Sequence, residues 1–344
     1  MNQKTYKAAI YRGIGSVEVV DLPYPECGDD EVIVKNLMSG ICGADVNAYN
    51  KGGDAHYIWQ DHEFGHEMVS EVVQIGKSVT DVKVGDYVFP HLGHAHRDRR
   101  RMATVGGFSE YIKIVQYEDG VSAFKMDKTL PVEQLAVIEP FVIGTRGAKN
   151  ADPGPGKTAV VFGAGLIGIS CALMLKYYGC DKVMVVDVLD NRLKALKKLG
   201  LETCNSASED LKAKAIEVFG SKPGLGGRGE NCAADVYVDC AGIQPVIDDF
   251  QALTAPGGTL VVVGVHHKPV TMNYMMLSYG QWTIKGCGTL PTGDAINDIM
   301  AMMKETKLDL TSLISHKFKL DQIVDALKMA GDPENALKVV IQFD

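Results

Sequence analysis

The feature that most constrains the fold is a regular alternation of strand-like and helix-like segments, which begins after the turn-forming run at 153–157. Residues 158–163 are rich in Val and predict a buried strand, and residues 166–179 predict a helix. The alternation continues with a strand, a helix and three further strands, at 182–187, 191–200, 234–240, 259–265 and 282–287. Strands joined by helices form a parallel sheet with helices on both faces, so this part of the chain predicts a doubly wound α/β fold.

A glycine motif lies between the first strand and the first helix of this alternation. It reads Gly163-Ala-Gly-Leu-Ile-Gly168 and is followed 19 residues later by Asp187, at the end of the next strand. Glycines let the backbone and a helix N-terminus approach a pyrophosphate, while the carboxylate accepts hydrogen bonds from the adenosine ribose. Because Asp187 would repel a 2′-phosphate, the motif predicts NAD rather than NADP; the alternative is a purely structural glycine turn. The residues assigned to the coenzyme site are Gly163, Gly165, Leu166, Ile167, Gly168, Asp187, Arg192 and Gly264.

The first part of the chain has a different pattern. Residues 7–41 contain short Val- and Ile-rich runs separated by Gly, Pro and Asp, which predicts strands and turns. From about residue 289 the pattern changes again, and this tail is too small to bury a core of its own. We therefore expect residues 1–150 and 289–344 to form one mostly β domain, with residues 151–288 inserted as the parallel-sheet domain.

The segment His62-Glu-Phe-Gly-His66 matches H-E-x-x-H, which on a helix provides two zinc-binding histidines and a general base to a metalloprotease. That function requires a helix, in which Gly65 would cost about 1 kcal/mol. The next residues, 68–76, are dominated by Val and Ile and favour a strand. The third ligand of the extended protease motif is also missing. A zinc hydrolase is therefore a weaker hypothesis than a metal with another role.

Further motifs occur in the order found in the zinc-dependent medium-chain dehydrogenases, and the chain resembles that family from end to end. Besides the glycine motif they are Ser39-Gly-Ile-Cys-Gly-Ala-Asp45, Gly65-His-Glu67, Val84-Gly-Asp86, Gly107-Phe-Ser-Glu-Tyr111, Glu139-Pro140, Asp239-Cys-Ala-Gly242 and Pro256-Gly-Gly258. The Gly-His-Glu and Glu-Pro segments are most similar to the polyol (sorbitol) and threonine dehydrogenase branch. The resemblance implies a GroES-like catalytic domain followed by an inserted Rossmann domain.

The resemblance also implies one catalytic zinc ion, held by Cys42, His66 and Glu67, with Glu139 as an exchangeable fourth ligand or one that acts through water. A thiolate, an imidazole and a carboxylate suit zinc and leave an open coordination position. In such enzymes zinc lowers the pKa of a bound alcohol, and hydride passes from its carbon to the nicotinamide. The chain is thus expected to oxidise a secondary alcohol, such as a polyol, a sugar or a sugar derivative, with NAD.

Two segments depart from the family pattern. Ala44 and Asn47 stand where the family commonly has a Ser or Thr and a His that pass the alcohol proton to solvent, so the proton must leave by another route. Residues 91–106 replace a lobe of four cysteines that holds a structural zinc, which implies a single metal per chain. This replacement carries a basic cluster that would suit an anionic hydroxy substrate, namely a sugar acid, a sugar phosphate, a sulfonate or L-threonine. The alternative is a solvated charge run at the pocket rim or at a subunit contact. The cluster consists of Arg97, Arg99, Arg100 and Arg101.

Three other functions stand as hypotheses beside these. The first is the zinc hydrolase that would use the segment 62–66. The second is a zinc-free reductase of the same superfamily, which would keep its activity in a chelator. The third is a non-catalytic NAD-binding protein, which the replacements Ala44 and Asn47 would fit, because such a protein needs no proton relay.

Bulk properties limit the partners. A formal net charge of −8 argues against nucleic acid and anionic membranes as partners. The N-terminal residues lack an apolar signal segment, which predicts a cytoplasmic location, and the eight cysteines include no CxxC pair, which predicts reduced thiols. The uncharged run 158–175 contains three glycines and is interpreted as buried core rather than a membrane span. The resemblance implies a homodimer or homotetramer, so the expected partners are a small-molecule alcohol and further copies of the chain.

Overall fold

The structure of the protein is a computed structural model, which describes residues 4–92, 103–287 and 292–344. The chain divides into two compact units. Unit 1 consists of Met1–Glu139 and Asp309–Asp344, and unit 2 consists of Pro140–Leu308. Unit 1 is therefore assembled from both ends of the chain, whereas unit 2 is continuous.

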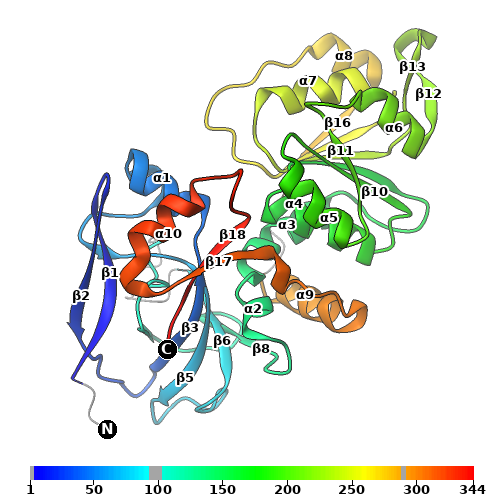
Figure 1. Cartoon of the computed structure of the whole chain (residues 1–344). Coiled ribbons are helices and arrows are strands. Elements are labelled where there is room, and N and C mark those ends of the chain that lie inside the picture. Colours follow the sequence, from blue (N-terminus) through cyan, green and yellow to red (C-terminus); the bar gives the residue numbers. More distant parts are fainter. Residues whose placement is uncertain (1–3, 93–102, 288–291) are drawn as a thin grey trace. The chain divides into compact units, whose positions relative to one another are not determined.

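Unit 1 is built mainly from antiparallel strands (Figure 1). Among the described residues, one sheet has the order β2-β1-β4 and another the order β17-β18-β3-β5-β6-β8, with β7 also paired to β3. The strands are β1 (Thr5–Gly13), β2 (Ser16–Pro23), β3 (Val32–Gly40), β4 (His62–Glu63), β5 (Glu67–Ile75), β6 (Tyr87–Pro90), β7 (Tyr111–Ile114), β8 (Ala123–Met126), β17 (Ile314–Phe318) and β18 (Lys338–Gln342). The helices are α1 (Gly43–Lys51), α2 (Val132–Leu135) and α10 (Ile323–Ala330), with 3₁₀ turns η1 (Asp54–His56), η3 (Thr311–Leu313) and η4 (Leu320–Gln322).

Strand β3 is the centre of the larger sheet. It pairs antiparallel with β5, β7 and β18, so nearly all of its residues are buried or half-buried. Figure 1 shows the C-terminal strand β18, in red, beside β3, in blue. The polar residues within this buried strand are bonded inside the fold: the Asn36 side chain, for example, donates to the carbonyl of Ser109 at 2.7 Å.

Unit 2 contains a parallel sheet of the order β11-β10-β9-β14-β15-β16 and a short hairpin, β12-β13. The strands are β9 (Thr158–Phe162), β10 (Lys182–Asp187), β11 (Glu202–Asn205), β12 (Ser221–Pro223), β13 (Glu230–Cys232), β14 (Val236–Asp239), β15 (Thr259–Val262) and β16 (Thr283–Gly286). The helices are α3 (Ile138–Asn150), α4 (Leu166–Tyr177), α5 (Asp190–Lys198), α6 (Leu211–Phe219), α7 (Gln244–Leu253), α8 (Tyr274–Gly280) and α9 (Thr292–Thr306), and η2 (Leu225–Gly227) is a 3₁₀ turn.

This order confirms the predicted doubly wound parallel sheet. The strand order reverses direction around β9, because β10 and β14 lie on its two sides. The five strands expected from the sequence correspond to β9, β10, β14, β15 and β16. Strand β11 and the hairpin β12-β13 were not predicted, because they are short and contain polar residues that carry little periodic signal.

The unit boundaries lie elsewhere than the predicted boundaries at 150/151 and 288/289, because α3 from Pro140 onwards and all of α9 belong to unit 2. Helix α3 packs tightly on α4: the Ser170 hydroxyl donates to the carbonyl of Phe141 at 2.8 Å, and a Cβ on Gly144 would lie 2.5 Å from the carbonyl oxygen of Ile167. Helix α9 contacts α3 through an ion pair between Asp298 of α9 and Lys149 of α3, at 3.1 Å. These long-range contacts decide the boundary, and local composition does not record them.

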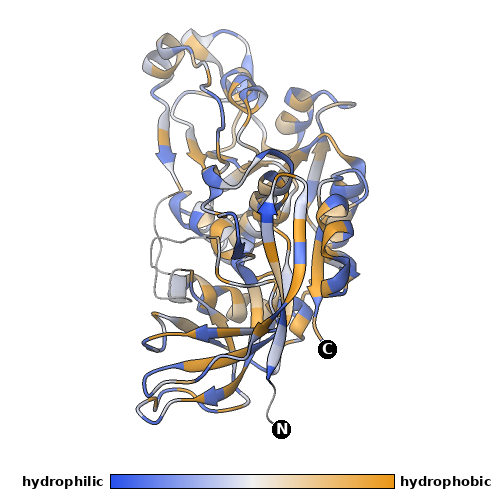
Figure 2. Ribbon diagram, turned by 90° about the vertical axis from the view of Figure 1, so that its left-hand side faces the viewer, coloured by the Kyte–Doolittle hydropathy of each residue, from blue (hydrophilic) through white to orange (hydrophobic). Residues whose placement is uncertain are grey.

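Hydrophobic residues, shown in orange in Figure 2, recur along the strands and helices of both units. In unit 1 one apolar cluster includes the edge-to-face pair Phe64 and Phe108, whose ring centroids lie 4.9 Å apart. In unit 2 another cluster gathers around Tyr237 and Phe250, between the parallel sheet and its helices. None of the helices within the described residues is long and apolar enough to cross a membrane.

Gly65, between β4 and β5, offers a direct test of this packing. Its φ is +88°, and a Cβ would lie 2.8 Å from the ring of Phe108. We expect Gly65→Ala to lower the free energy of unfolding by more than about 1 kcal/mol, because the substitution combines an unfavourable φ with a clash. Denaturant titration measures the loss. Gly43→Ala, in the same unit and with nothing within 4 Å of the added Cβ, is the control; equal stability of the two variants would contradict the prediction.

Candidate metal centre and coenzyme site

Three predicted metal ligands come together in unit 1. Strands β3 and β5 pair antiparallel with Gly40 opposite Glu67, so Cys42, just beyond the end of β3, lies near His66 and Glu67 at the start of β5. One donor atom from each of Cys42, His66 and Glu67 lies within 4.8 Å of the others. Among the described residues this is the only such group of three possible ligands. The separation and the sulfur, nitrogen and oxygen donors fit one zinc ion, whose bonds to such donors are about 2.0–2.3 Å long.

A buried carboxylate lies near the ring of His66. Nδ1 of His66 faces Oδ1 of Asp45 at 4.0 Å, and Asp45 is fully buried. The other oxygen of Asp45 accepts a hydrogen bond from the backbone N–H of Cys42 at 2.8 Å, at the start of α1. Asp45 therefore lies next to both Cys42 and His66, and a carboxylate near a metal-binding imidazole is a common feature of metal sites.

The electrostatics of this cluster favour a cation. Burial raises the pKa of the Cys42 thiol, and the charge of Glu67 raises it further. Burial also raises the pKa of Asp45 to about 6. Burial lowers the pKa of His66, but the charges of Cys42 and Asp45 outweigh that effect and the pKa lies well above its ordinary value. Acidic groups are therefore crowded in a buried place, and a divalent ion would relieve their repulsion.

A buried lysine, Lys338 of β18, also belongs to the cluster and was not predicted. Its Nζ is paired with Oε2 of Glu67 and also donates to the carbonyl of Ile41 at 3.0 Å, and its side chain is only 4% exposed. Gly40 lies beneath this pair, where a Cβ would be 2.5 Å from both Glu67 Oε2 and Lys338 Cε. The only sequence signal was one lysine within the apolar run 336–341, which is unusual for a buried strand.

Glu139 lies in the first turn of α3 and is half-buried. It is not part of the three-residue group, but its charge contributes to the raised pKa of His66 and of Lys338, which places it within electrostatic reach of both. For Lys338, burial lowers the pKa, and the charges of Glu67, Cys42 and Glu139 raise it to a net increase. The role of Glu139 as a ligand stays a prediction.

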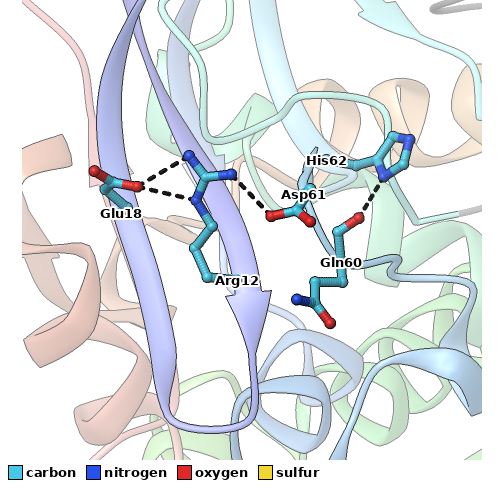
Figure 3. A network of polar contacts seen from close by, with 5 residues as sticks. All are labelled: Arg12, Glu18, Gln60, Asp61 and His62. Carbon is cyan, nitrogen blue, oxygen red and sulfur yellow. Dashed lines mark hydrogen bonds and ion pairs between the residues drawn. The ribbon is translucent and has the colours of Figure 1, made fainter.

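The first residues of the H-E-x-x-H segment point elsewhere. His62 lies in β4, and its Nδ1 is 2.7 Å from the carbonyl oxygen of Gln60. Figure 3 shows this contact beside the exposed ion pairs that Arg12 makes with Glu18 and Asp61, at 2.9 Å each. His62 is therefore held by its own loop rather than by the metal cluster.

Glu63 has a structural role. Its Oε1 accepts hydrogen bonds from the hydroxyl groups of Tyr6, at 3.1 Å, and Ser109, at 2.7 Å. The segment forms a strand and a turn at Gly65 instead of a helix, so His62 and His66 do not share a helical face. The zinc hydrolase hypothesis is wrong, because the segment forms a strand and a turn where the motif requires a helix, and the hydroxyl groups of Tyr6 and Ser109 bind the carboxylate that would be its general base.

The glycine motif of unit 2 has the close packing expected for it. Gly163 has φ +100°, and a Cβ on Gly168 would lie 1.8 Å from the carbonyl oxygen of Gly163. Helix α4 begins at Leu166, with Gly165 at its N-cap and no side-chain hydrogen bond to that cap. Of the two residues between the second and third glycines, Leu166 is buried and Ile167 is half-buried. A backbone that turns this sharply into an open helix N-terminus is suited to bind a pyrophosphate.

Asp187 stands at the end of β10, beside this turn. One oxygen accepts from the backbone N–H of Ala164 at 2.6 Å, and the other accepts from Val188 and Leu189 at 2.8 and 2.9 Å. The carboxylate therefore fixes the glycine turn to the neighbouring strand. The guanidinium of Arg192 lies close to the same turn, because its Nη1 would be 4.0 Å from a Cβ on Gly165.

Gly264, the last predicted coenzyme residue, follows β15. A Cβ there would lie 2.4 Å from the backbone nitrogen of Gly242, in the turn after β14. The predicted coenzyme residues thus occupy the carboxyl ends of β9, β10 and β15, the edge at which ligands bind in parallel sheets. Their individual contacts to the coenzyme stay predictions.

Comparison with known proteins identifies the family. Residues 28–123 match the alcohol dehydrogenase GroES-like domain, and residues 167–306 match the zinc-binding dehydrogenase domain. The chain belongs to the zinc-dependent medium-chain dehydrogenase family. Membership confirms the predicted GroES-like and Rossmann fold and makes the chain a dehydrogenase that uses zinc and a nicotinamide coenzyme.

Relatives in this family match the chain over nearly its full length. Sorbitol dehydrogenase 1 of Saccharomyces cerevisiae is 29% identical over 342 residues, which cover 95% of this chain and 94% of that protein. D-xylulose reductase of the same organism is 28% identical and covers 98% of each chain. The crystal structure of 2R,3R-butanediol dehydrogenase from Bacillus subtilis has a TM-score of 0.82 at 23% identity and covers 98% of this chain and 100% of that one. That likeness shows a shared fold.

The departures from the family pattern are partly visible in the structure. Ala44 and Asn47 lie on α1, and Ala44 packs against the apolar cluster of unit 1. A methyl group in that position cannot relay a proton, so the release route stays open. The predicted basic cluster at 97–101 falls outside the described residues, and so does most of the histidine-rich part of 91–106.

The pair of Lys338 and Glu67 generates a stability prediction. Removal of one partner leaves a buried charge uncompensated, which typically costs about 3–5 kcal/mol. We expect Lys338→Met to lower the free energy of unfolding by about 3 kcal/mol in chelator, and by less in zinc, because an ion bound by Glu67 also neutralises it. Denaturant titrations with and without zinc measure both values.

The matched control is Lys317→Met, whose partner Glu133 at 2.8 Å is partly exposed. Loss of that pair should cost less than about 1 kcal/mol with or without zinc. A loss in Lys338→Met no larger than in the control would contradict the prediction. Addition of Glu67→Gln to Lys338→Met should restore part of the stability in chelator.

Proposed function

We propose that the chain oxidises a secondary alcohol of a polyol, sugar or sugar derivative and transfers hydride to NAD. The observation that carries this proposal is the group Cys42, His66 and Glu67, with its donor atoms within 4.8 Å in a buried place. Relatives named sorbitol dehydrogenase and D-xylulose reductase, matched over almost the whole chain, support a polyol as substrate. A zinc ion in this site would act as a Lewis acid on the substrate hydroxyl, which lowers its pKa.

Each residue of the cluster has a distinct part in the proposal. Cys42, His66 and Glu67 hold the ion, and Glu139 acts as the exchangeable ligand. Asp45, whose Oδ1 lies 4.0 Å from Nδ1 of His66, would position the imidazole when the ion binds Nε2. Lys338 holds the carboxylate of Glu67 on one side and leaves its second oxygen for the ion. Such supporting contacts typically change metal affinity by 10- to 100-fold when they are lost.

In unit 2 the proposal assigns the pyrophosphate to the glycine turn and the adenosine ribose to Asp187. The carboxylate of Asp187 would repel a 2′-phosphate, which supports NAD over NADP. Arg192, close to Gly165, would counter the charge of the pyrophosphate. NAD binding by this unit depends on backbone groups and two charged side chains, so it requires no metal.

A substrate panel read at the nicotinamide absorbance tests the proposal. We expect NAD-dependent oxidation of neutral polyols such as sorbitol and xylitol, little activity with NADP, and a loss of at least about 100-fold in chelator or in Cys42→Ala, because the ion supplies several kcal/mol to the transition state. Cys27→Ala, a half-buried thiol bonded to the Glu31 carbonyl, is the control.

The same panel separates the other hypotheses. Activity that survives chelation would indicate a zinc-free reductase, and NAD binding without turnover of any alcohol would indicate a non-catalytic protein. Sugar acids, sugar phosphates, a hydroxysulfonate and L-threonine complete the panel. A clear preference for these anions would replace the neutral polyol with an anionic hydroxy substrate.

We further propose that the protein acts in the cytoplasm as a homo-oligomer. All eight cysteines are free, which suits a reducing compartment. Among the described strands, β16 forms one edge of the parallel sheet, and Ile284 on it is 45% exposed. The neighbouring helix α8 exposes Tyr274 and Tyr279 by more than 70%. An unpaired strand edge beside exposed apolar side chains is suited to pair with a second copy.

Light scattering coupled to gel filtration tests this assembly. We expect a dimer or tetramer, and a shift towards monomer in Ile284→Lys, because a charge on the edge strand opposes strand pairing between copies. Val84→Lys, at an exposed apolar position in unit 1 that is 58% accessible, should keep the assembly. A monomeric wild type, or equal behaviour of the two variants, would contradict the proposal.

A further inference from the structure

Three turns of unit 2 are packed backbone against backbone at the carboxyl edge of the sheet. They follow the adjacent strands β9, β14 and β15. A Cβ on Gly163 would lie 3.3 Å from the carbonyl carbon of Cys240, and one on Gly242 would lie 2.6 Å from the carbonyl oxygen of Val265. At these points the glycines let the backbones approach each other closely, so the relative positions of the turns are closely fixed.

The third turn carries His266, which a buried carboxylate holds in place. Nε2 of His266 is 2.7 Å from Oδ2 of Asp239, the last residue of β14, which is fully buried. The other oxygen of Asp239 accepts from the backbone N–H groups of Ala241 and Gly242, at 2.9 and 2.8 Å. Asp239 therefore fixes both the turn after β14 and the orientation of the imidazole.

The contact with Asp239 determines whether the other ring nitrogen of His266, Nδ1, is a hydrogen-bond donor or an acceptor. A neutral imidazole whose Nε2–H points at a carboxylate carries its lone pair on Nδ1. Nδ1 of His266 has no hydrogen-bond partner within the described ranges of the chain, and the side chain is 16% exposed. A buried acceptor without a donor is unfavourable, so a hydrogen-bond donor from a ligand that contacts this nitrogen would stabilise it.

The strand order indicates which part of a dinucleotide lies there. Asp187, predicted to bind the adenosine ribose, ends β10 on one side of β9, and His266 follows β15 on the other side. A dinucleotide whose pyrophosphate lies on the glycine turn therefore directs its nicotinamide half over the turns after β14 and β15. The donors of that half are the ribose hydroxyls and the carboxamide N–H group.

We propose that His266, oriented by Asp239, binds the coenzyme by accepting a hydrogen bond from its nicotinamide nucleoside. The proposal rests on the proposed function, because it requires that unit 2 binds NAD. In this proposal His266 contacts the nicotinamide half of the coenzyme and makes no contact with the adenosine half.

Calorimetric titration of the full-length protein with NADH and with ADP-ribose tests this. ADP-ribose contains the adenosine half and the pyrophosphate but no nicotinamide. We expect His266→Ala to weaken NADH binding about tenfold and to leave ADP-ribose binding unchanged, the effect of one lost hydrogen bond. His266→Gln, which keeps both a donor for Asp239 and an acceptor, should bind NADH more tightly than His266→Ala. His316→Ala, in unit 1, should match the wild type.

Unchanged NADH affinity in His266→Ala would overturn the proposal, and so would an equal loss for NADH and ADP-ribose, which would indicate a structural role.

Reduced 3-acetylpyridine adenine dinucleotide, which lacks the amide N–H, distinguishes the two possible donors, the carboxamide and a ribose hydroxyl. If the carboxamide is the donor, His266→Ala should not weaken binding of this analogue. If a ribose hydroxyl is the donor, His266→Ala should weaken binding of NADH and of the analogue equally. If no alcohol is oxidised but NADH binding still depends on His266, the proposed function fails and this inference stands.

Discussion

The pairing of β3 with β5 on one side and β18 on the other is the constraint on which the metal centre depends. Gly40 at the end of β3 lies opposite Glu67 in one pairing and opposite Val340 in the other. Because Gly40 has no side chain, Lys338 and Glu67 meet across it. A shift of either strand by one residue would turn these side chains to the opposite face, so the register of the sheet sets the position of the ligands.

The buried ionisable residues of the metal centre are better suited to bind an ion than to stabilise the fold. A thiol, an imidazole and two carboxylates lie together behind β3, and Lys338 supplies one compensating charge. Buried ion pairs contribute little net stability, because desolvation offsets their attraction. The arrangement is therefore better explained by binding of an ion than by stabilisation of the fold. The geometry around Asp45 and Lys338 supports the ligands in the same way that the outer contacts of metal sites generally do.

In unit 2 the candidate coenzyme site is formed mainly by backbone groups, whereas the metal centre of unit 1 is formed by side chains. Its glycine turn, the turn after β14 and the turn after β15 form a surface in which there is little room for side chains at the contact points. Two carboxylates, Asp187 and Asp239, hold these turns by accepting backbone N–H groups. A coenzyme can approach such a surface closely, and the few side chains that remain at its edge, such as His266, then set its orientation.

The sequence by itself determined the parallel sheet and the glycine turn, because each depends on local spacing: a strand followed by glycines and a helix has one favoured geometry. The residues Cys42, His66 and Glu67 were expected from the family resemblance of their motifs, and the pairing of β3 with β5 brings them together. The sequence also favoured a strand over a helix at 68–76, since the apolar pattern and Gly65 agreed there.

Only the tertiary structure decided the residues that hold these groups in place. Lys338 and Glu67 are 271 residues apart in the sequence, and His266 and Asp239 are 27 apart, with no motif to relate them. The structural role of Glu63 and the assignment of α3 and α9 to unit 2 depend on contacts of the same kind. Local patterns record the conformation of the backbone, whereas the pairing of distant side chains depends on the register and packing of the whole sheet, which a single sequence does not express.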